Sequence, residues 1–279
     1  MKPRLFLPVL AIMLGMVAVA QADPITLYSD AFTNSTGSNV LLSNHPLDVT
    51  SGLYGATAGA GWTASSGWSD NYISGRAYTT NGNPAHSDAW LPLTPQSGCV
   101  YTLSAKLYMY QGNDSSAATS QYFGLGFAYA TSGVPSTSAA FYTPAQTWIV
   151  DNPMASSYKI GYASTSASSF TDSKITYNSS LSLVDGWHTL KVVLDTSNAQ
   201  WVASYFVDTT SLGSVTYAAG SNPVIKAVGF GGYVGNGSSP MLDTFSLTAT
   251  PSQVPEPGTL ALLAAGLVGL VAYAWRKRG

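Results

Sequence analysis

Residues 100–110, VYTLSAKLYMY, alternate between larger apolar side chains and smaller or polar ones. The apolar set falls on every second position and consists of Tyr101, Leu103, Ala105, Leu107 and Met109. Thr102, Ser104 and Lys106 lie between them. Because successive side chains of a strand point to opposite faces of a sheet, this period of two predicts a β-strand with one buried face.

Strand signals recur along the chain, with turn-forming residues between them. Residues 122–129 place Phe123, Leu125 and Phe127 opposite two glycines, and residues 224–230 and 241–248 supply two further strands. Residues 187–194 and 201–207 predict an antiparallel pair joined by the turn at 195–198. No sustained helical period precedes residue 259, and no internal repeat is evident. The sequence therefore predicts an all-β, antiparallel, two-sheet jelly-roll sandwich.

Composition limits the partners of residues 23–253. This segment has twelve Asp, no Glu, five Lys and one Arg, a formal charge of −6. It lacks the basic surface that nucleic-acid binding requires. Its aromatic and β-branched residues argue against disorder. The chain has one cysteine, Cys99, so no intramolecular disulfide forms, and we expect Cys99 to be a small buried hydrophobe.

The N-terminus has the pattern of an export signal. Lys2 and Arg4 precede an apolar run over residues 5–20, followed by Ala20-Gln21-Ala22, a small-x-small cleavage pattern. These features predict a cleaved signal peptide over residues 1–22 and a mature chain from Asp23. A retained N-terminal membrane anchor is the alternative.

The C-terminus carries a second pattern, which is typical of a protein-sorting signal. Val254, Pro255, Glu256 and Pro257 lead into an apolar run over residues 259–275, and a basic stop follows at Arg276, Lys277 and Arg278. That run spans roughly 26 Å as a helix, just enough for a bilayer core. The basic residues should stay on the cytoplasmic side. We therefore predict a linker with the Pro-Glu-Pro motif over 251–258, and a single transmembrane helix with a basic C-terminus over 259–279.

This tail resembles the PEP-CTERM sorting tail of bacterial proteins. The resemblance implies an exosortase-type processing enzyme as partner and processing at or near Pro255-Glu256-Pro257. It also implies that the protein is anchored in the membrane by the C-terminal helix until it is processed, and then reaches the cell surface or the extracellular matrix.

Several short stretches over residues 27–250 resemble laminin-G-like, concanavalin-type jelly rolls. They are residues 28–32, YSDAF; 91–95, LPLTP; 185–190, DGWHTL; 205–208, YFVD; and 242–247, LDTFSL. The resemblance predicts a jelly-roll domain over residues 23–250, and implies that its first and last strands pair.

No catalytic group is predicted. Concanavalin-type glucanases hydrolyse glycosides with closely spaced glutamates, and the one glutamate of this chain is Glu256, in the sorting motif. The aspartate pairs Asp195 with Asp208, and Asp70 with Asp88, are conceivable substitutes, but turn capping and solvation explain such residues more readily.

Two histidine patterns contain residue types that are found in catalytic sites. His86-Ser87-Asp88 contains the residue types of a triad, but neighbours in sequence seldom form its geometry. His188 stands in a predicted strand, where the resemblance makes it structural and a general base is the alternative.

Neither a metal nor another cofactor is predicted, because C-x-x-C, H-E-x-x-H and EF-hand patterns are missing from the sequence. Related jelly rolls often hold calcium through Asp, Asn and carbonyl oxygens. A calcium site at Asp114 or Asp151 therefore stays open as an alternative.

Aromatic residues give the one positive indication of a ligand. Trp62, Trp68, Tyr72 and Trp90 lie in loop-like sequence, and exposed rings stack well on sugar faces, although core packing is the alternative for each. We predict a secreted, non-enzymatic envelope or matrix protein that binds polysaccharide through a lectin-like sandwich. A purely structural surface or biofilm protein, and an Asp-based glycoside hydrolase, are the alternatives.

Overall fold

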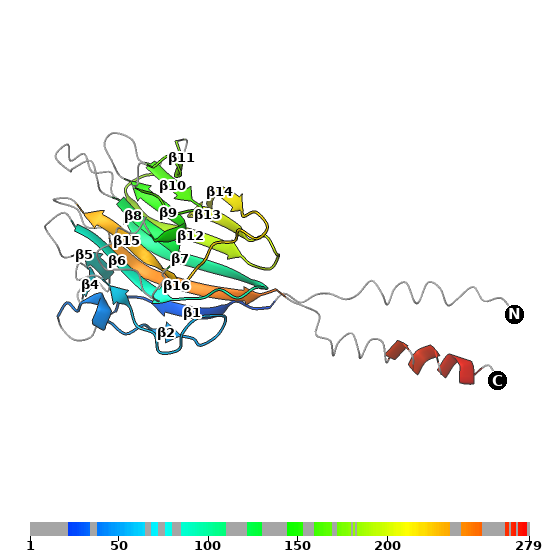
Figure 1. Ribbon diagram of the computed structural model, residues 1–279. Helices are drawn as coiled ribbons and strands as arrows, with labels where there is room; N and C mark the ends of the chain where they lie inside the picture. Colours follow the sequence, from blue (N-terminus) through cyan, green and yellow to red (C-terminus); the bar gives the residue numbers. More distant parts are fainter. Residues whose placement is uncertain are drawn as a thin grey trace. The chain divides into compact units, whose positions relative to one another are not determined.

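The computed structural model separates into two units, residues Pro24–Thr250 and the two chain ends, Met1–Asp23 with Pro251–Gly279. The residues that it describes are 22–33, 38–64, 68–71, 76–79, 85–109, 122–129, 144–152, 159–168, 172–179, 181, 183–234, 241–252, 266–267, 269–271 and 273–277. Strands dominate the first unit (Figure 1).

The larger sheet of the described chain has nine strands. Their order is β14-β13-β12-β7-β16-β1-β2, with β5 paired to β16 and β4 paired to β5. The strands are β1 (Ile25–Asp30), β2 (Val49–Thr50), β4 (Trp68–Asn71), β5 (Arg76–Thr79), β7 (Cys99–Met109), β12 (Gly186–Asp195), β13 (Val202–Val207), β14 (Thr210–Thr216) and β16 (Met241–Pro251).

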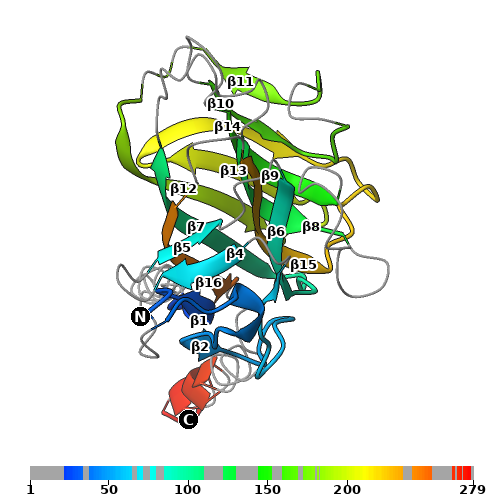
Figure 2. The same ribbon diagram turned by 90° about the vertical axis from the view of Figure 1, so that its left-hand side faces the viewer.

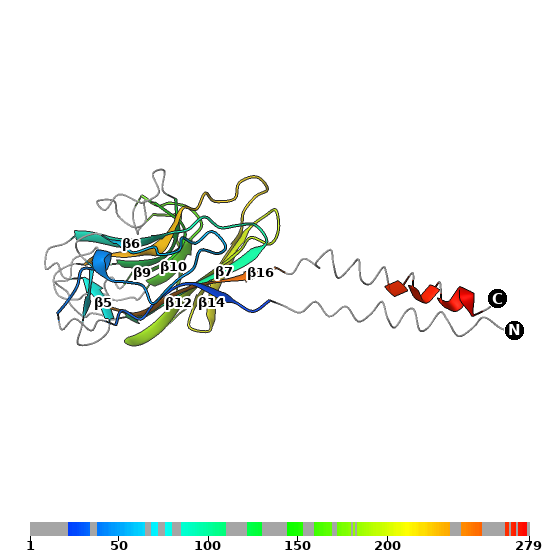
Figure 3. The same cartoon turned by 90° about the horizontal axis from the view of Figure 1, so that it is seen from below.

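The smaller sheet has seven described strands in the order β11-β10-β9-β8-β15-β6-β3. They are β3 (Thr63–Ala64), β6 (Ala85–Pro92), β8 (Tyr122–Ala128), β9 (Ala145–Asn152), β10 (Lys159–Ala163), β11 (Thr176–Asn178) and β15 (Ala227–Val234), and a short 3-10 helix, η1 (Leu42–Asn44), precedes β2. Figure 3 shows the two sheets as layers, with β6, β9 and β10 in one and β12 and β14 in the other. The two-sheet antiparallel sandwich predicted from the sequence is confirmed.

Strand β7 shows why the sequence folds this way. Its side chains alternate strictly between buried and half-buried from Cys99 to Met109. The buried set faces the other sheet and packs in a core that includes Leu103, Phe123 and Phe245. β1 pairs with β16, from Ile25 opposite Ala249 to Asp30 opposite Phe245, so the first and last strands close the sandwich.

Two strands differ from the sequence prediction. β8 was expected to have one buried face, but all seven of its residues are buried. The reason is a second apolar cluster on the outer side of the seven-stranded sheet, which includes Trp90, Tyr122 and Trp148. The strand predicted over 224–230 begins only at Ala227, and Val224 before it is exposed.

The chain ends are described in part. Residues 266–267, 269–271 and 273–276 are helical. Within the described residues, no helix is both long and apolar enough to cross a membrane. Residues 1–21 of the predicted signal peptide lie outside the described residues. The signal peptide and the transmembrane helix over 259–279 stay predictions.

Candidate functional site

Trp62, predicted as a sugar contact, lies in the core between the sheets. It is 3% exposed, and its Nε1 donates to Oδ2 of Asp30 at 2.7 Å. Its ring packs edge-on against Phe230 and Phe245, with centroids 5.1 and 4.9 Å away. Packing in the core therefore accounts for Trp62, and its ring is not presented at the surface.

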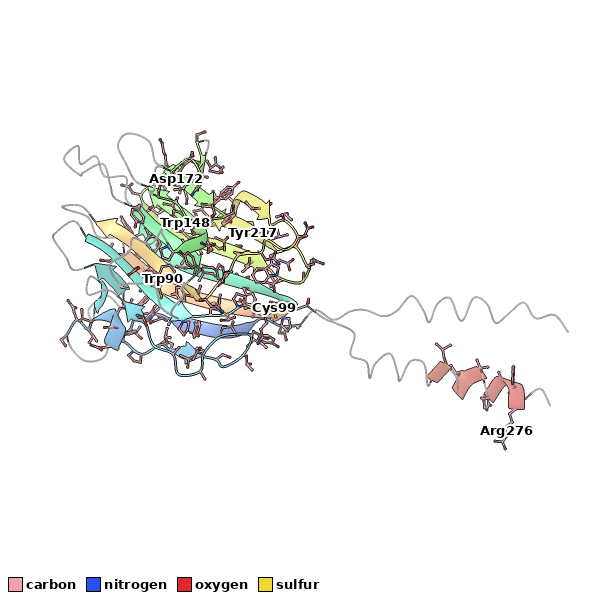
Figure 4. The ribbon with its side chains drawn as sticks, viewed as in Figure 1. Trp90, Cys99, Trp148, Asp172, Tyr217 and Arg276 are labelled. Atoms are coloured by element: carbon pink, nitrogen blue, oxygen red, sulfur yellow. The ribbon has the colours of Figure 1, made fainter. Side chains whose placement is uncertain are left out.

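The other three predicted contacts are distributed differently. Trp68 begins β4, but its side chain lies outside the described residues, as does the whole of Tyr72. Trp90 stands on the outer face of β6, where it is 2% exposed (Figure 4). The structure thus places Trp90 on a sheet face and Trp62 between the sheets.

Trp90 faces a second tryptophan across a strip of glycines. In the strand register, Trp90 is opposite Gly229, Gly229 is opposite Gly126, and Gly126 is opposite Trp148. Figure 2 shows β6, β15 and β8 side by side. Three interstrand steps of ~4.8 Å put the two tryptophan backbones roughly 14 Å apart. Trp148 was not singled out from the sequence, although residues 145–152 carry a strand-like run.

This outer face is closed in the structure. Trp148 is fully buried, its Nε1 donates to the carbonyl oxygen of Thr165 at 3.1 Å, and it belongs to a cluster with Ala167 and Ile175. The segment between β10 and β11 therefore covers the β9 side of the face. A pocket opens at the opposite, β3 edge, lined by Thr57, Ala60, Gly61, Thr63, Trp90, Leu91, Pro92 and Ala227.

Asp88 has its carboxyl group on the same outer face of the seven-stranded sheet as Trp90. It is 1% exposed, and its Oδ2 accepts a hydrogen bond from Trp90 Nε1 at 2.9 Å. Burial raises the pKa of Asp88 to about 6, although the bond from Trp90 acts in the opposite direction. Because strand side chains alternate, Ser87 points away from Asp88. The triad arrangement of His86, Ser87 and Asp88 is therefore not formed on β6.

The remaining candidate acids have local partners. Asp195 caps the turn after β12 by accepting from the backbone N–H of Ser197 at 2.8 Å. Asp208 lies 2.7 Å from Nδ1 of His188. The side chain of Asp70 lies outside the described residues. These contacts give Asp195 and Asp208 structural roles.

A calcium site finds no support among the described residues. They contain no group of three or more His, Cys, Asp or Glu side chains that could hold a metal. Asp151 is 4% exposed and pairs in β9 opposite Phe123 and Ile160, two residues of the core. Asp114 lies outside the described residues. A calcium site at Asp114 or Asp151 stays a prediction.

An accessible set of rings lies on the outer side of the nine-stranded sheet. Tyr108 and Trp187 are cross-strand neighbours on β7 and β12, with ring centroids 5.3 Å apart and planes at 77°. Lys106 Nζ lies 5.4 Å from the centroid of the Trp187 ring and 2.7 Å from Oδ2 of Asp243. All four side chains are only partly buried, so they remain within reach of a ligand.

A second ring and lysine continue this surface along β12 and β13. Lys191 is paired with Phe206, and its Nζ lies 4.4 Å from the centroid of that ring. In the strand register Thr189 lies between the two ring sites on β12, Ser104 is opposite Lys191, and Thr102 and Ser204 are opposite Val193. We call Lys106, Tyr108, Trp187, Lys191, Phe206 and Asp243 the aromatic face. Residues 187–194 were predicted as a strand, but no local motif marks Trp187 or Lys191 as a ligand contact.

The sorting motif lies apart from these faces in the sequence. Val254, Pro255, Glu256 and Pro257 are outside the described residues, as is Arg278. Arg276 and Lys277 are exposed at the end of the described helical residues, where the backbone N–H of Lys277 donates to Tyr273.

Comparison with known proteins gives a motif and a fold. Residues 253–278 match the PEP-CTERM protein-sorting motif. The curated proteins compared contain no match to this sequence.

Three solved structures illustrate the fold. The endo-1,3-beta-glucanase from Streptomyces sioyaensis is similar at 16% identity and a TM-score of 0.51, with 82% of this chain and 99% of that chain covered. The Emp47p carbohydrate recognition domain has 12% identity, a TM-score of 0.49, and coverage of 80% and 99%. The Lotus tetragonolobus seed lectin has 12% identity, a TM-score of 0.46, and coverage of 82% and 100%.

The likeness to the glucanase shows the fold alone, because folds host unrelated activities. The chain thus carries a PEP-CTERM sorting motif over residues 253–278, and its residues 24–250 form an all-β, antiparallel two-sheet sandwich similar in fold to that of the glucanase.

Proposed function

We propose that this is an exported, non-enzymatic protein of the cell surface or extracellular matrix that binds neutral polysaccharide on its aromatic face. The PEP-CTERM motif supports export and exosortase sorting. The observation that carries the ligand class is the pair of half-buried rings, Tyr108 and Trp187, flanked by Lys106 and Asp243.

The chemistry of this set suits sugars. The faces of the rings attract the C–H side of a pyranose, while a lysine and a carboxylate next to them can donate to and accept from hydroxyl groups. The outer side of a sheet is an extended surface, which favours a polymer over a single sugar.

Neutral polymers are favoured over acidic ones by charge. On the aromatic face the charge of Lys106 is balanced by Asp243, 2.7 Å away, and Lys191, over the Phe206 ring, adds one positive charge. Residues 23–253 carry a formal charge of −6, which repels an acidic chain at low salt. A 1,3-β-glucan belongs among the test ligands, because the glucanase with the same fold is named for it.

The proposal of no enzymatic activity rests on the carboxylates. Glycoside hydrolysis needs two of them across the scissile bond. Asp88 faces outward from the seven-stranded sheet, while Asp195 and Asp208 are engaged in turn and histidine contacts.

A purely structural role is the second candidate, and one observation favours it. Trp62, Trp90 and Trp148 are each no more than 3% exposed, as expected of a protein whose rings serve its own packing. The two candidates differ in whether any ring binds a ligand.

Binding of the purified protein to a panel of neutral and acidic polysaccharides, with and without calcium, separates them. We expect saturable binding to a neutral polymer, weakened about two- to tenfold by Trp187→Ala, since an aromatic contact contributes about 0.5–1.5 kcal/mol. Tyr129→Ala is the matched control, because Tyr129 is 38% exposed and lies at the end of β8 in the other sheet. No binding to any polymer would favour the structural role.

A further inference from the structure

His188 follows Trp187 on β12 and makes two short contacts with its ring nitrogens. Nδ1 lies 2.7 Å from Oδ2 of Asp208, and Nε2 lies 2.8 Å from the carbonyl oxygen of Val184. A carboxylate and a carbonyl only accept hydrogen bonds, so both ring nitrogens must donate. Only the imidazolium form of histidine has two N–H groups. The geometry therefore requires His188 to be positively charged.

The charges around His188 agree with this requirement. Asp208 comes from the turn between β13 and β14, Asp151 from β9, and Asp185 from the segment before β12. Burial lowers the pKa of His188, but the hydrogen bonds to Asp208 and Val184 and the charges of Asp208 and Asp151 outweigh it, so that the pKa is raised. The pKa of Asp208 is lowered: burial raises it, and the bonds from His188 and the Thr189 N–H outweigh burial.

These contacts join three segments on the side of β12 opposite to the Trp187 ring, because successive strand side chains point to opposite faces. Val184 lies in the segment that leads into β12, and Asp208 adopts a φ of 50° in the turn after β13. Asp208 also accepts from the backbone N–H of Thr189 at 2.8 Å, and its own N–H donates to the Thr189 carbonyl. Between Val184 and Trp187 stands Gly186, with a φ of 151°, a conformation that side chains rarely adopt. The path of the chain into Trp187 is thus set by the His188 contact with Val184, by the conformation of Gly186 and by the pairing of Gly186 with Met109 of β7.

We propose that charged His188 is a positioning residue for the aromatic face: it holds the segment from Val184 to Gly186 and thereby fixes the Trp187 ring beside Tyr108. This inference rests on the proposed function. A neutral imidazole donates from one nitrogen only, so deprotonation breaks one of the two contacts. Polysaccharide affinity should then fall as the pH rises through the pKa of His188, which lies above its usual value of 6.5.

The test is the affinity for a neutral polysaccharide between pH 5 and pH 9, for the wild type, His188→Gln and Asp208→Asn. We expect the wild type to lose about three- to tenfold in affinity across the titration, the effect of one hydrogen bond. His188→Gln cannot titrate and should bind weakly with a flat pH profile. Asp208→Asn should lower the pH at which the affinity falls. Tyr129→Ala, away from both segments, should follow the wild-type profile.

A structural readout accompanies the binding assay. Exchange rates of the backbone amides of residues 185–187 should rise, beyond the intrinsic pH effect, as the His188 NMR signal titrates. Wild-type binding that is unchanged over this pH range would overturn the positioning role and leave the proposed function intact. No binding at any pH would overturn the proposed function, and amide exchange that ignores the His188 titration would then overturn the positioning role as well.

Discussion

Among the described residues, two indole N–H groups donate hydrogen bonds to buried carboxylates. Trp62 donates to Asp30 between the sheets, and Trp90 donates to Asp88 on the outer side of the seven-stranded sheet. Each acid is 1% exposed. A buried polar group without a partner is costly, so each tryptophan stabilises its acid as well as filling space.

Trp62→Ala should therefore act on stability. Removing a buried tryptophan costs about 3–5 kcal/mol, and here it also takes a donor away from Asp30. Urea denaturation measures the loss in the free energy of unfolding. Trp187→Ala, whose ring is half-buried at the surface, should cost much less. Equal losses for the two variants would contradict the placement of Trp62 in the core.

Asp88 should make stability depend on pH. Its pKa is raised from 3.8 in the unfolded chain to about 6 in the folded protein. The free energy of unfolding is therefore highest below pH 3.8, and it decreases as the pH rises to about 6. The associated change is on the order of 2–3 kcal/mol. Asp88→Asn keeps an acceptor for Trp90 and removes the charge. Its stability relative to the wild type should increase from pH 4 to pH 7 in denaturant titrations, and a constant difference would refute the assignment.

The local sequence around each tryptophan does not predict whether its side chain is buried. Trp62 stands in glycine-rich sequence that predicts a loop, and its acceptor Asp30 is 32 residues away. Only the pairing of distant strands brings the two together. Trp187, by contrast, lies in the strand predicted over residues 187–194, and there it is on the side of the sheet opposite to the buried Leu190 and Val192.

At the scale of elements, strict alternation was the reliable signal. β7 follows it from Cys99 to Met109, and β12 and β13 pair as expected. β8 departs from this alternation because the apolar cluster that includes Trp90, Tyr122 and Trp148 covers its glycines, Gly124 and Gly126. No local sequence pattern predicts that cluster. The glycines allow neighbouring backbones to pack closely.

Substitutions in the glycine strip should reveal that close packing. A Cβ at Gly229 would collide with the carbonyl oxygen of Ala89, and one at Gly126 would come within 2.7 Å of Trp148 Cα. Gly229→Ala and Gly126→Ala should each lower the free energy of unfolding by about 1–3 kcal/mol, the usual effect of overpacking.

Gly61→Ala is the matched control, because a Cβ there meets nothing within 4 Å. Thermal or urea denaturation of the three variants provides the comparison. If Gly126→Ala and Gly229→Ala matched Gly61→Ala in stability, the tight approach of β8 and β15 to their neighbours would be refuted.

At the scale of the whole molecule, β1 closes the sandwich against β16, which brings the two ends of the folded unit onto adjacent strands. The sequence predicted this closure through resemblance, and predicted the sorting tail from its motif. It did not predict the aromatic face, because Tyr108 and Trp187 are 79 positions apart and meet only through the pairing of β7 with β12.

The central claim is that a neutral polysaccharide binds on the aromatic face. NMR titration of the tryptophan indole N–H signals with a soluble neutral oligosaccharide tests it most directly. We predict a saturable shift of the Trp187 signal, with the signals of Trp62 and Trp148 unchanged. A saturable shift of the Trp90 and Trp148 signals with Trp187 unaffected would contradict the account and place the ligand on the seven-stranded sheet.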